Sequence, residues 1–139
     1  MKPLIVSEYV APGTVQFVYR DYAFRGDQAI RAAEAAACAA DQGAFWRFHD
    51  TLFLNQTGPA SFVDDRLKQM AAELGLDTQA FNSCLDSGEK RAEVEASIAE
   101  GQELGVDSTP TIFVNGTEVE AWHDFNAVSQ AIENALADG

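Results

Sequence analysis

Cys38 and Cys84 are the only residues of the chain that could carry thiol chemistry. Disulfide exchange needs an exposed, activated thiolate, often at a helix N-terminus, and a second sulfur about one helical turn away. The two cysteines lie far apart in sequence, inside segments expected to be helical, so they form no C-x-x-C pair, zinc knuckle or disulfide-rich framework. The residues themselves leave two alternatives, one structural disulfide or two small buried thiols. A catalytic dithiol is not expected from them.

The imidazoles are restricted to His49 and His123, and neither has a cysteine or an acidic cluster at ligand spacing. The sequence therefore predicts no metal site, and it indicates no cofactor. His49 lies in a segment that also contains Trp46 and in which four apolar residues recur at helical spacing, Phe45, Phe48, Leu52 and Phe53. Such an aromatic stripe could line a peptide groove, but it is more typical of a core face.

Charge and composition exclude several classes of partner. The chain has 139 residues, 47% of them hydrophobic, as expected for one globular domain. Nine Lys and Arg against 22 Asp and Glu give a formal charge of −13 and a pI near 4.3. Because this field repels phosphate backbones and anionic lipid surfaces, neither nucleic acid nor membrane is expected as a partner. No run approaches the ~20 apolar residues of a membrane span, and residues 1–8 do not resemble a signal peptide.

The first half of the chain predicts one strand and two helices after a short helical remnant at Pro3–Val10. The β-branched and aromatic run Thr14–Tyr22 favours a strand. The Ala-rich segment Gln28–Gln42 favours a helix that ends before Gly43. Ala44–Asn55 carries the aromatic stripe and predicts a second helix.

Three more helices are expected before the next β region. They begin at Ser61, at the capping residue Asp77 and at Glu89, and glycines end them at positions 75, 88 and 105. The acidic residues of the last of these helices indicate a solvated face.

The clearest local signal is a hairpin. Asn115-Gly116 separates Thr111–Val114 from Thr117–Ala121, and this dipeptide accepts the positive φ angles of a two-residue type I′ turn. Asp124 then caps a final helix. The order of elements predicts an α/β domain with a helical insertion.

The stretch Gly105–Gly116 joins a helix stop, a Thr-Pro peptide, a strand and an Asn-Gly turn. It resembles the Gly-Val-x-Gly-Thr-Pro-Thr-x-x-Val-Asn-Gly pattern of the DsbA-like thiol-disulfide oxidoreductases, a branch of the thioredoxin superfamily. Four further segments are similar to that family: 18–21 to a strand, 32–40 to the first inserted helix, 42–50 to its Q-G-x-F-W-x-x-H-D run and 81–88 to the inserted domain.

Two departures from the family pattern stand out. Ser108 replaces the usual glycine, a change from one small residue to another. The family's Cys-Pro-x-Cys-type motif, with the strand before it, has no counterpart in these residues. We therefore expect an N-terminally truncated form of the domain, shorter by about 25 to 30 residues.

The resemblance implies a single DsbA-like domain over 1–139. Residues 11–23 and 106–139 would form its thioredoxin-like part, without the first, central strand, and residues 27–105 the inserted helical part. It also implies that Cys38 and Cys84 form the family's structural disulfide. Ser108, Thr109 and Pro110 would bind substrate, with Pro110 cis, although X-Pro bonds are cis in only about 5% of cases.

As an activity, the resemblance implies protein thiol-disulfide oxidoreduction, with cysteine-containing proteins or peptides as substrates, a redox partner protein and a periplasmic or other extracytoplasmic location. A chain without the C-x-x-C motif is expected to be inactive. Two alternatives remain: a non-redox peptide-binding or chaperone-like module, and a glutathione-using relative that binds glutathione near Thr109. Because the absent strand would lie between Thr14–Tyr22 and Thr111–Val114, a homo-oligomer that covers the unpaired edges is also expected.

Overall fold

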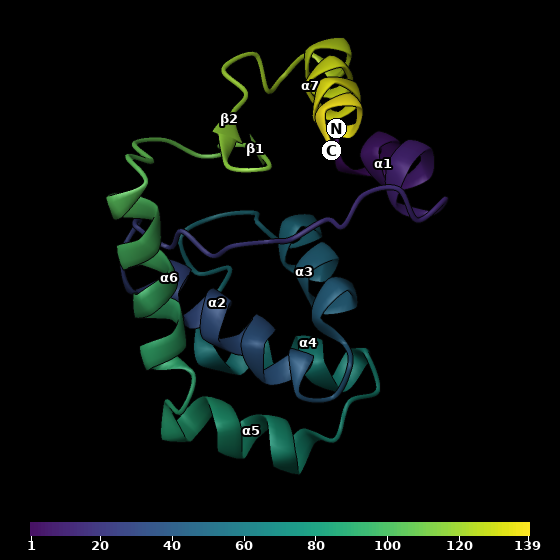
Figure 1. Cartoon of the computed structure of the whole chain (residues 1–139). Helices are drawn as coiled ribbons and strands as arrows, with labels where there is room; N and C mark the ends of the chain where they lie inside the picture. Colours follow the sequence, from purple (N-terminus) through teal and green to yellow (C-terminus); the bar gives the residue numbers. More distant parts are fainter. The chain divides into compact units, whose positions relative to one another are not determined.

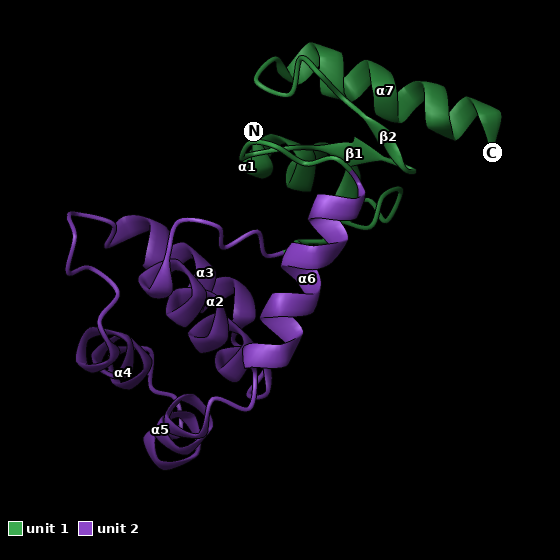
Figure 2. Ribbon diagram, turned by 90° about the vertical axis from the view of Figure 1, so that its left-hand side faces the viewer, with its two compact units in different colours: residues 1–20, 105–139 green, residues 21–104 purple.

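The Ala-rich segment forms helix α2 (Asp27–Ala40), around which residues 21–104 are packed. The computed structural model describes residues 1–139, and the chain divides into two units, residues 1–20 with 105–139 and residues 21–104 (Figure 2). The second unit is entirely helical, with α3 (Phe45–Leu54), α4 (Asp64–Glu73), α5 (Thr78–Ser87) and α6 (Arg91–Glu103) following α2.

Helix α2 lies at the centre of this unit and contacts each of the other four helices (Figure 1). Six of its alanines are buried, and their small side chains let the neighbouring helices approach closely. The largest side chains that complete the core are Phe48 on α3, Leu67 and Met70 on α4, and Phe81 and Leu85 on α5. The predicted aromatic stripe of α3 is thus divided, because Phe48 is buried whereas Phe53 is exposed.

A disulfide joins α2 to α5. Cys38 and Cys84 are bonded across a Cα–Cα distance of 5.9 Å, and both belong to the core of the helical unit. The structure thereby selects the disulfide from the two alternatives that the residues left open.

Charged residues tie α2 to α4 and α6. The guanidinium of Arg31 donates to both carboxylate oxygens of Asp64, at 2.9 and 2.7 Å, and to Glu34 Oε2 at 3.3 Å. Arg91 on α6 lies 3.1 Å from the same oxygen of Glu34. The hydrogen bond from Arg31 is the main reason why the pKa of Asp64 is lowered.

The other unit contains α1 (Lys2–Ile5), the π-helical turn η1 (Val6–Val10), the strands β1 (Phe113–Val114) and β2 (Thr117–Glu118), and α7 (Phe125–Asp138). Its core joins Ile5 and Tyr9 to Val119 of the hairpin and to Val128 and Ile132 of α7. The hydroxyl groups of Tyr9 and Ser129 are hydrogen-bonded, which links the first helical segment to the last.

The predicted hairpin is confirmed. β1 and β2 are antiparallel, with Val114 opposite Thr117 and Phe113 opposite Glu118. Asn115 and Gly116 have φ angles of 46° and 83°, as a type I′ turn requires. Asp124 accepts a hydrogen bond from the backbone N–H of Asn126 and caps α7.

The predicted strand at Thr14–Tyr22 is wrong, because this segment lies outside any strand. A strand is defined by the hydrogen bonds that it shares with a neighbour, and propensity alone does not supply one. The N–H groups of Thr14 and Val15 donate instead to Tyr9 O, at 3.0 and 3.1 Å.

One helix start also differs from the prediction. α4 begins at Asp64, and Ser61 instead stabilises the preceding turn, where its Oγ accepts hydrogen bonds from the N–H groups of Thr57 and Gly58 at 2.9 Å each. None of the helices combines the length and the apolar character required to cross a bilayer.

Candidate functional site

The loop Ser108–Thr111 enters β1 with an unusual backbone geometry. The Thr109–Pro110 peptide bond is cis. Ser108, Thr109 and Pro110 are all exposed, and the loop is closed by a 2.8 Å hydrogen bond from Thr111 Oγ1 to Ser108 O. No hydrogen bond within the chain uses the backbone of Thr109. Its N–H and C=O groups are therefore available to an extended peptide lying along the loop.

The hairpin holds the end of this loop in place. The N–H of Val119 donates to Ile112 O at 2.8 Å, so the pairing of the two strands continues to the residue just after Thr111. On the other side, Gly105 has a φ angle of +78°, a left-handed conformation in which the chain turns away from the preceding helix. The loop is thus a short exposed segment between a glycine turn and a paired strand.

The two cysteines do not lie in a position for disulfide exchange. Cys38 is 1% exposed and Cys84 is 7% exposed, and no free cysteine is present. Cys38 lies near the C-terminal end of α2, so the partial positive charge of a helix N-terminus does not act on its sulfur. The pair is enclosed by the core and cannot readily meet a protein thiol.

His49 belongs to an aromatic cluster on α3. Its ring lies 5.3 Å from Trp46 and 4.8 Å from Phe53, measured between centroids, and its Nδ1 is 2.9 Å from Asp50 Oδ1. The side chains of Asp41, Cys84 and Glu89 also come together, but the sulfur of Cys84 is bonded to Cys38 and the two carboxylates are exposed. Neither group provides the donor set of a metal centre.

Asp21 is a partly buried acid that the sequence did not indicate. Its backbone carbonyl accepts a 2.8 Å hydrogen bond from Ser97 Oγ of α6, and the ring of Tyr22 lies over Gly101 of the same helix. A Cβ atom at Gly101 would be 2.7 Å from Tyr22 Cδ2, so only glycine allows this approach. The glycine within a helical segment was the one available signal for this contact.

Burial raises the pKa of Asp21 from 3.8 to about 6, with the negative charge of Glu93 as the second cause. The folded chain therefore binds this proton more tightly than the unfolded chain, and folding stability falls as the pH rises from about 4 to about 6. We expect Asp21→Asn to stabilise the protein at pH 7 by about 1 to 2 kcal/mol, a value that allows for partial solvation of the carboxylate. Below pH 4 the gain should vanish.

Urea unfolding of both proteins between pH 3.5 and 8 measures this difference. In a Glu93→Gln background the gain from Asp21→Asn should be smaller, because the charge that opposes ionisation of Asp21 is gone. An equal gain at every pH would contradict the assignment of the effect to the Asp21 proton.

The chain combines an all-helical unit with a unit in which a hairpin packs against a C-terminal helix and follows a cis-proline loop. The predicted thioredoxin-like fold class is confirmed by comparison. The solved structure of oxidised BdbD from Bacillus subtilis matches 97% of this chain and 76% of that chain with a TM-score of 0.88, at 24% sequence identity. A family model described as Thioredoxin matches residues 2–134, and the chain belongs to this family.

Curated relatives are of two kinds. The Na⁺/H⁺ antiporter NhaA of Herminiimonas arsenicoxydans is 36% identical over 102 residues, 73% of this chain and 16% of the antiporter. Disulfide bond formation protein D of Bacillus subtilis is 25% identical over 148 residues, 96% of this chain and 63% of that protein. The chain thus spans a small part of the first relative and less than two thirds of the second.

Proposed function

We propose that these residues belong to a DsbA-like protein thiol-disulfide oxidoreductase. Membership of the thioredoxin family, the similarity to disulfide bond formation protein D and the exposed cis-proline loop support this proposal. The single observation that carries it is the Thr109–Pro110 loop, whose free backbone groups suit an extended cysteine-containing peptide. A redox partner protein and an extracytoplasmic location are part of the same proposal.

Ser108, Thr109 and Pro110 would position the substrate rather than react with it. Thr109 would offer its N–H and C=O to the substrate backbone, and Pro110 would fix the direction of the loop. Cys38 and Cys84 would have a structural role, since both are buried and bonded to each other. The homo-oligomer expected from the sequence is also part of the proposal.

The 139-residue chain by itself is expected to show no thiol-disulfide turnover. Exchange starts from an accessible thiolate, and the chain has no free cysteine and no C-x-x-C pair. In an insulin-reduction assay and in oxidation of a peptide dithiol, we expect rates equal to those of the uncatalysed reactions. Bacillus subtilis disulfide bond formation protein D provides a comparison protein in both assays.

A Cys38→Ala/Cys84→Ala variant distinguishes the possible outcomes. If the wild-type chain shows turnover above background and the variant does not, the exchange is due to the buried disulfide. The structural role given to this bond would then be overturned. Turnover that persists in the variant would reveal a contaminant, because no sulfur nucleophile other than cysteine is available to it.

The absence of any free thiol in the structure favours one alternative, a non-redox module that binds extended peptides at the same loop. Binding of a cysteine-containing peptide and of its serine analogue discriminates the two functions. An oxidoreductase site should prefer the cysteine peptide, whereas a non-redox module should bind both with equal affinity. In either case Thr109→Pro should weaken binding, because it removes the N–H that pairs with the peptide.

A further inference from the structure

A second candidate binding site lies between the hairpin and α7, away from the cis-proline loop and independent of the proposed function. A cavity of about 590 Å³ is lined by one row of residues on α7 and by both strands. The lining residues that carry the argument are Val114, Glu118, Val119, Glu120, Ala131 and Ala135. Its volume falls within the range of about 300 to 1,000 Å³ found for ligand pockets.

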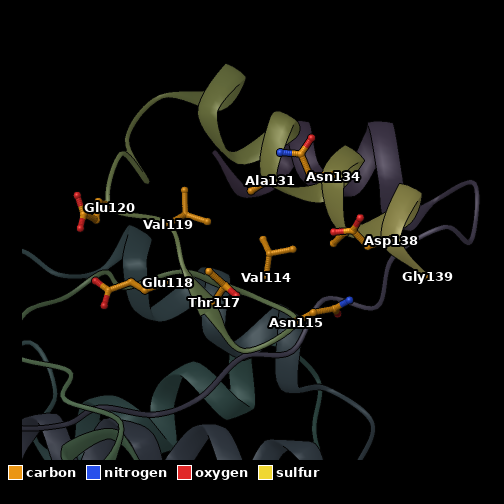
Figure 3. A pocket seen from close by; sticks show the side chains of 11 residues that line it. Val114, Asn115, Thr117, Glu118, Val119, Glu120, Ala131, Asn134, Asp138 and Gly139 are labelled. Atoms are coloured by element: carbon orange, nitrogen blue, oxygen red, sulfur yellow. The ribbon is translucent and has the colours of Figure 1, made fainter.

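The floor of this cavity is apolar. Val114 and Val119 point toward α7, where Ala131 lies opposite them (Figure 3). Ala131 and Ala135 are small, and they leave space above the two valines instead of filling it. The cavity is therefore suited to apolar side chains that enter between the hairpin and the helix.

The outer edge of β2 forms one side of the cavity and carries unused backbone groups. The sheet has two strands, so this edge has no neighbour. Val119 N–H donates to Ile112 O, so Ile112 and Val119 form a hydrogen-bonded pair of the ladder. The adjacent pair, Phe113 and Glu118, is therefore a non-hydrogen-bonded pair. In an antiparallel ladder the N–H and C=O of Glu118 then point outward, where an added strand could accept and donate hydrogen bonds.

The charges of the edge indicate what kind of strand fits. Glu118 and Glu120 alternate with Val119 and point away from the space under α7 (Figure 3). Asp138 adds a third carboxylate at the open end, and no Lys, Arg or His lines the cavity. Residues of an added strand alternate in the same way, so every second side chain would lie beside a glutamate.

We propose that the groove between β2 and α7 binds an extended peptide segment in which apolar and basic residues alternate. The backbone of the peptide extends the sheet at Glu118. Its apolar side chains enter the cavity over Val119, Ala131 and Ala135, and its Lys or Arg side chains pair with Glu118 and Glu120. A second copy of this chain is a poor occupant, because pairing of two β2 edges would place glutamates against glutamates.

The test uses the full chain and a fluorescently labelled short peptide in which Lys and Val alternate. Anisotropy should show saturable binding, and Glu118→Lys/Glu120→Lys should weaken it at least about tenfold. The same variant should prefer a peptide in which Glu and Val alternate, a reversal that simple loss of fold cannot produce. Far-UV circular dichroism checks that the variant is folded.

Matched controls separate the groove from the general attraction between an acidic protein and a basic peptide. Glu95→Lys/Glu133→Lys makes the same change in net charge at two exposed helical positions outside the groove, and it should alter the affinity less than about threefold. Ala135→Trp should weaken binding of the alternating peptide at least about tenfold, because the indole occupies the space of the apolar side chains.

Three results would overturn the proposal. One is equal loss of affinity in the two double variants. Another is equal binding of a peptide with the same composition but with Lys and Val in separate blocks. The third is a dimer, seen by light scattering, that Glu118→Pro converts to a monomer, since this would assign the edge to a second copy.

Discussion

Removal of the Cys38–Cys84 disulfide is expected to lower the free energy of unfolding by about 4 kcal/mol. The bond closes a loop with a sequence separation of 46, and in the chain-entropy model a crosslink of this length restricts the unfolded ensemble by about that amount. The loop spans α2 to α5, the helices that build most of the core of the helical unit. This cost is a large part of the roughly 5 to 15 kcal/mol by which domains are stable.

The measurement compares the wild-type chain with Cys38→Ala/Cys84→Ala in urea, each with and without dithiothreitol. The reduced wild type should approach the stability of the double variant, and the variant should not respond to the reductant. Because the sulfurs are buried, reduction of the wild type should be slow in the absence of urea. A double variant within about 1 kcal/mol of the oxidised wild type would show that the bond has little effect on stability.

A structural disulfide and a catalytic disulfide need opposite surroundings. A catalytic pair must be exposed and easily reduced, whereas burial in a helical core favours persistence of the bond. Cys38 and Cys84 have the buried surroundings of a structural disulfide, and the exposed cis-proline loop contains no sulfur. The disulfide thus belongs to the helical unit, whereas the loop that we propose for substrate binding belongs to the other unit.

Local sequence signals were sufficient where the element depends on its own residues. The Asn115-Gly116 turn, the Asp124 cap and the alanine-rich helix were predicted because propensity, capping and positive φ angles act within a few residues. The loop at Thr109 was located through its resemblance to a family. Its cis bond could not be derived from the residues, since an X-Pro bond is cis or trans according to the surrounding fold.

Local sequence signals failed to predict the structure where it depends on contacts with residues far away in the sequence. Thr14–Tyr22 has the composition of a strand, but none of its residues belongs to one. Glu34 occurs among alanines in a helix, and nothing local shows that it is 1% exposed. Its burial depends on Arg91, which lies far along the chain and reaches it only after α6 has packed on α2.

Arg31→Met is expected to destabilise the protein by about 3 kcal/mol, because it leaves the buried carboxylate of Glu34 with one cationic partner instead of two. Glu34 Oε1 is already buried without a hydrogen-bond partner, so the site has no spare donor to compensate. Methionine retains much of the aliphatic bulk of arginine. The loss of stability should therefore come from the missing charge and hydrogen bonds more than from changed packing. The bidentate bond to Asp64, which is partly exposed, accounts for the smaller share.

Lys68→Met supplies the matched control, since it removes the partner of Asp86 from a more exposed ion pair and should cost less than about 1 kcal/mol. The decisive variant is Glu34→Gln in the Arg31→Met background. If the buried charge is the cause, the glutamine removes it and should recover at least about 1 kcal/mol of the loss, measured by urea unfolding at pH 7. Additive losses from the two substitutions would contradict this explanation and would indicate that Arg31 stabilises the helices through its contact with Asp64.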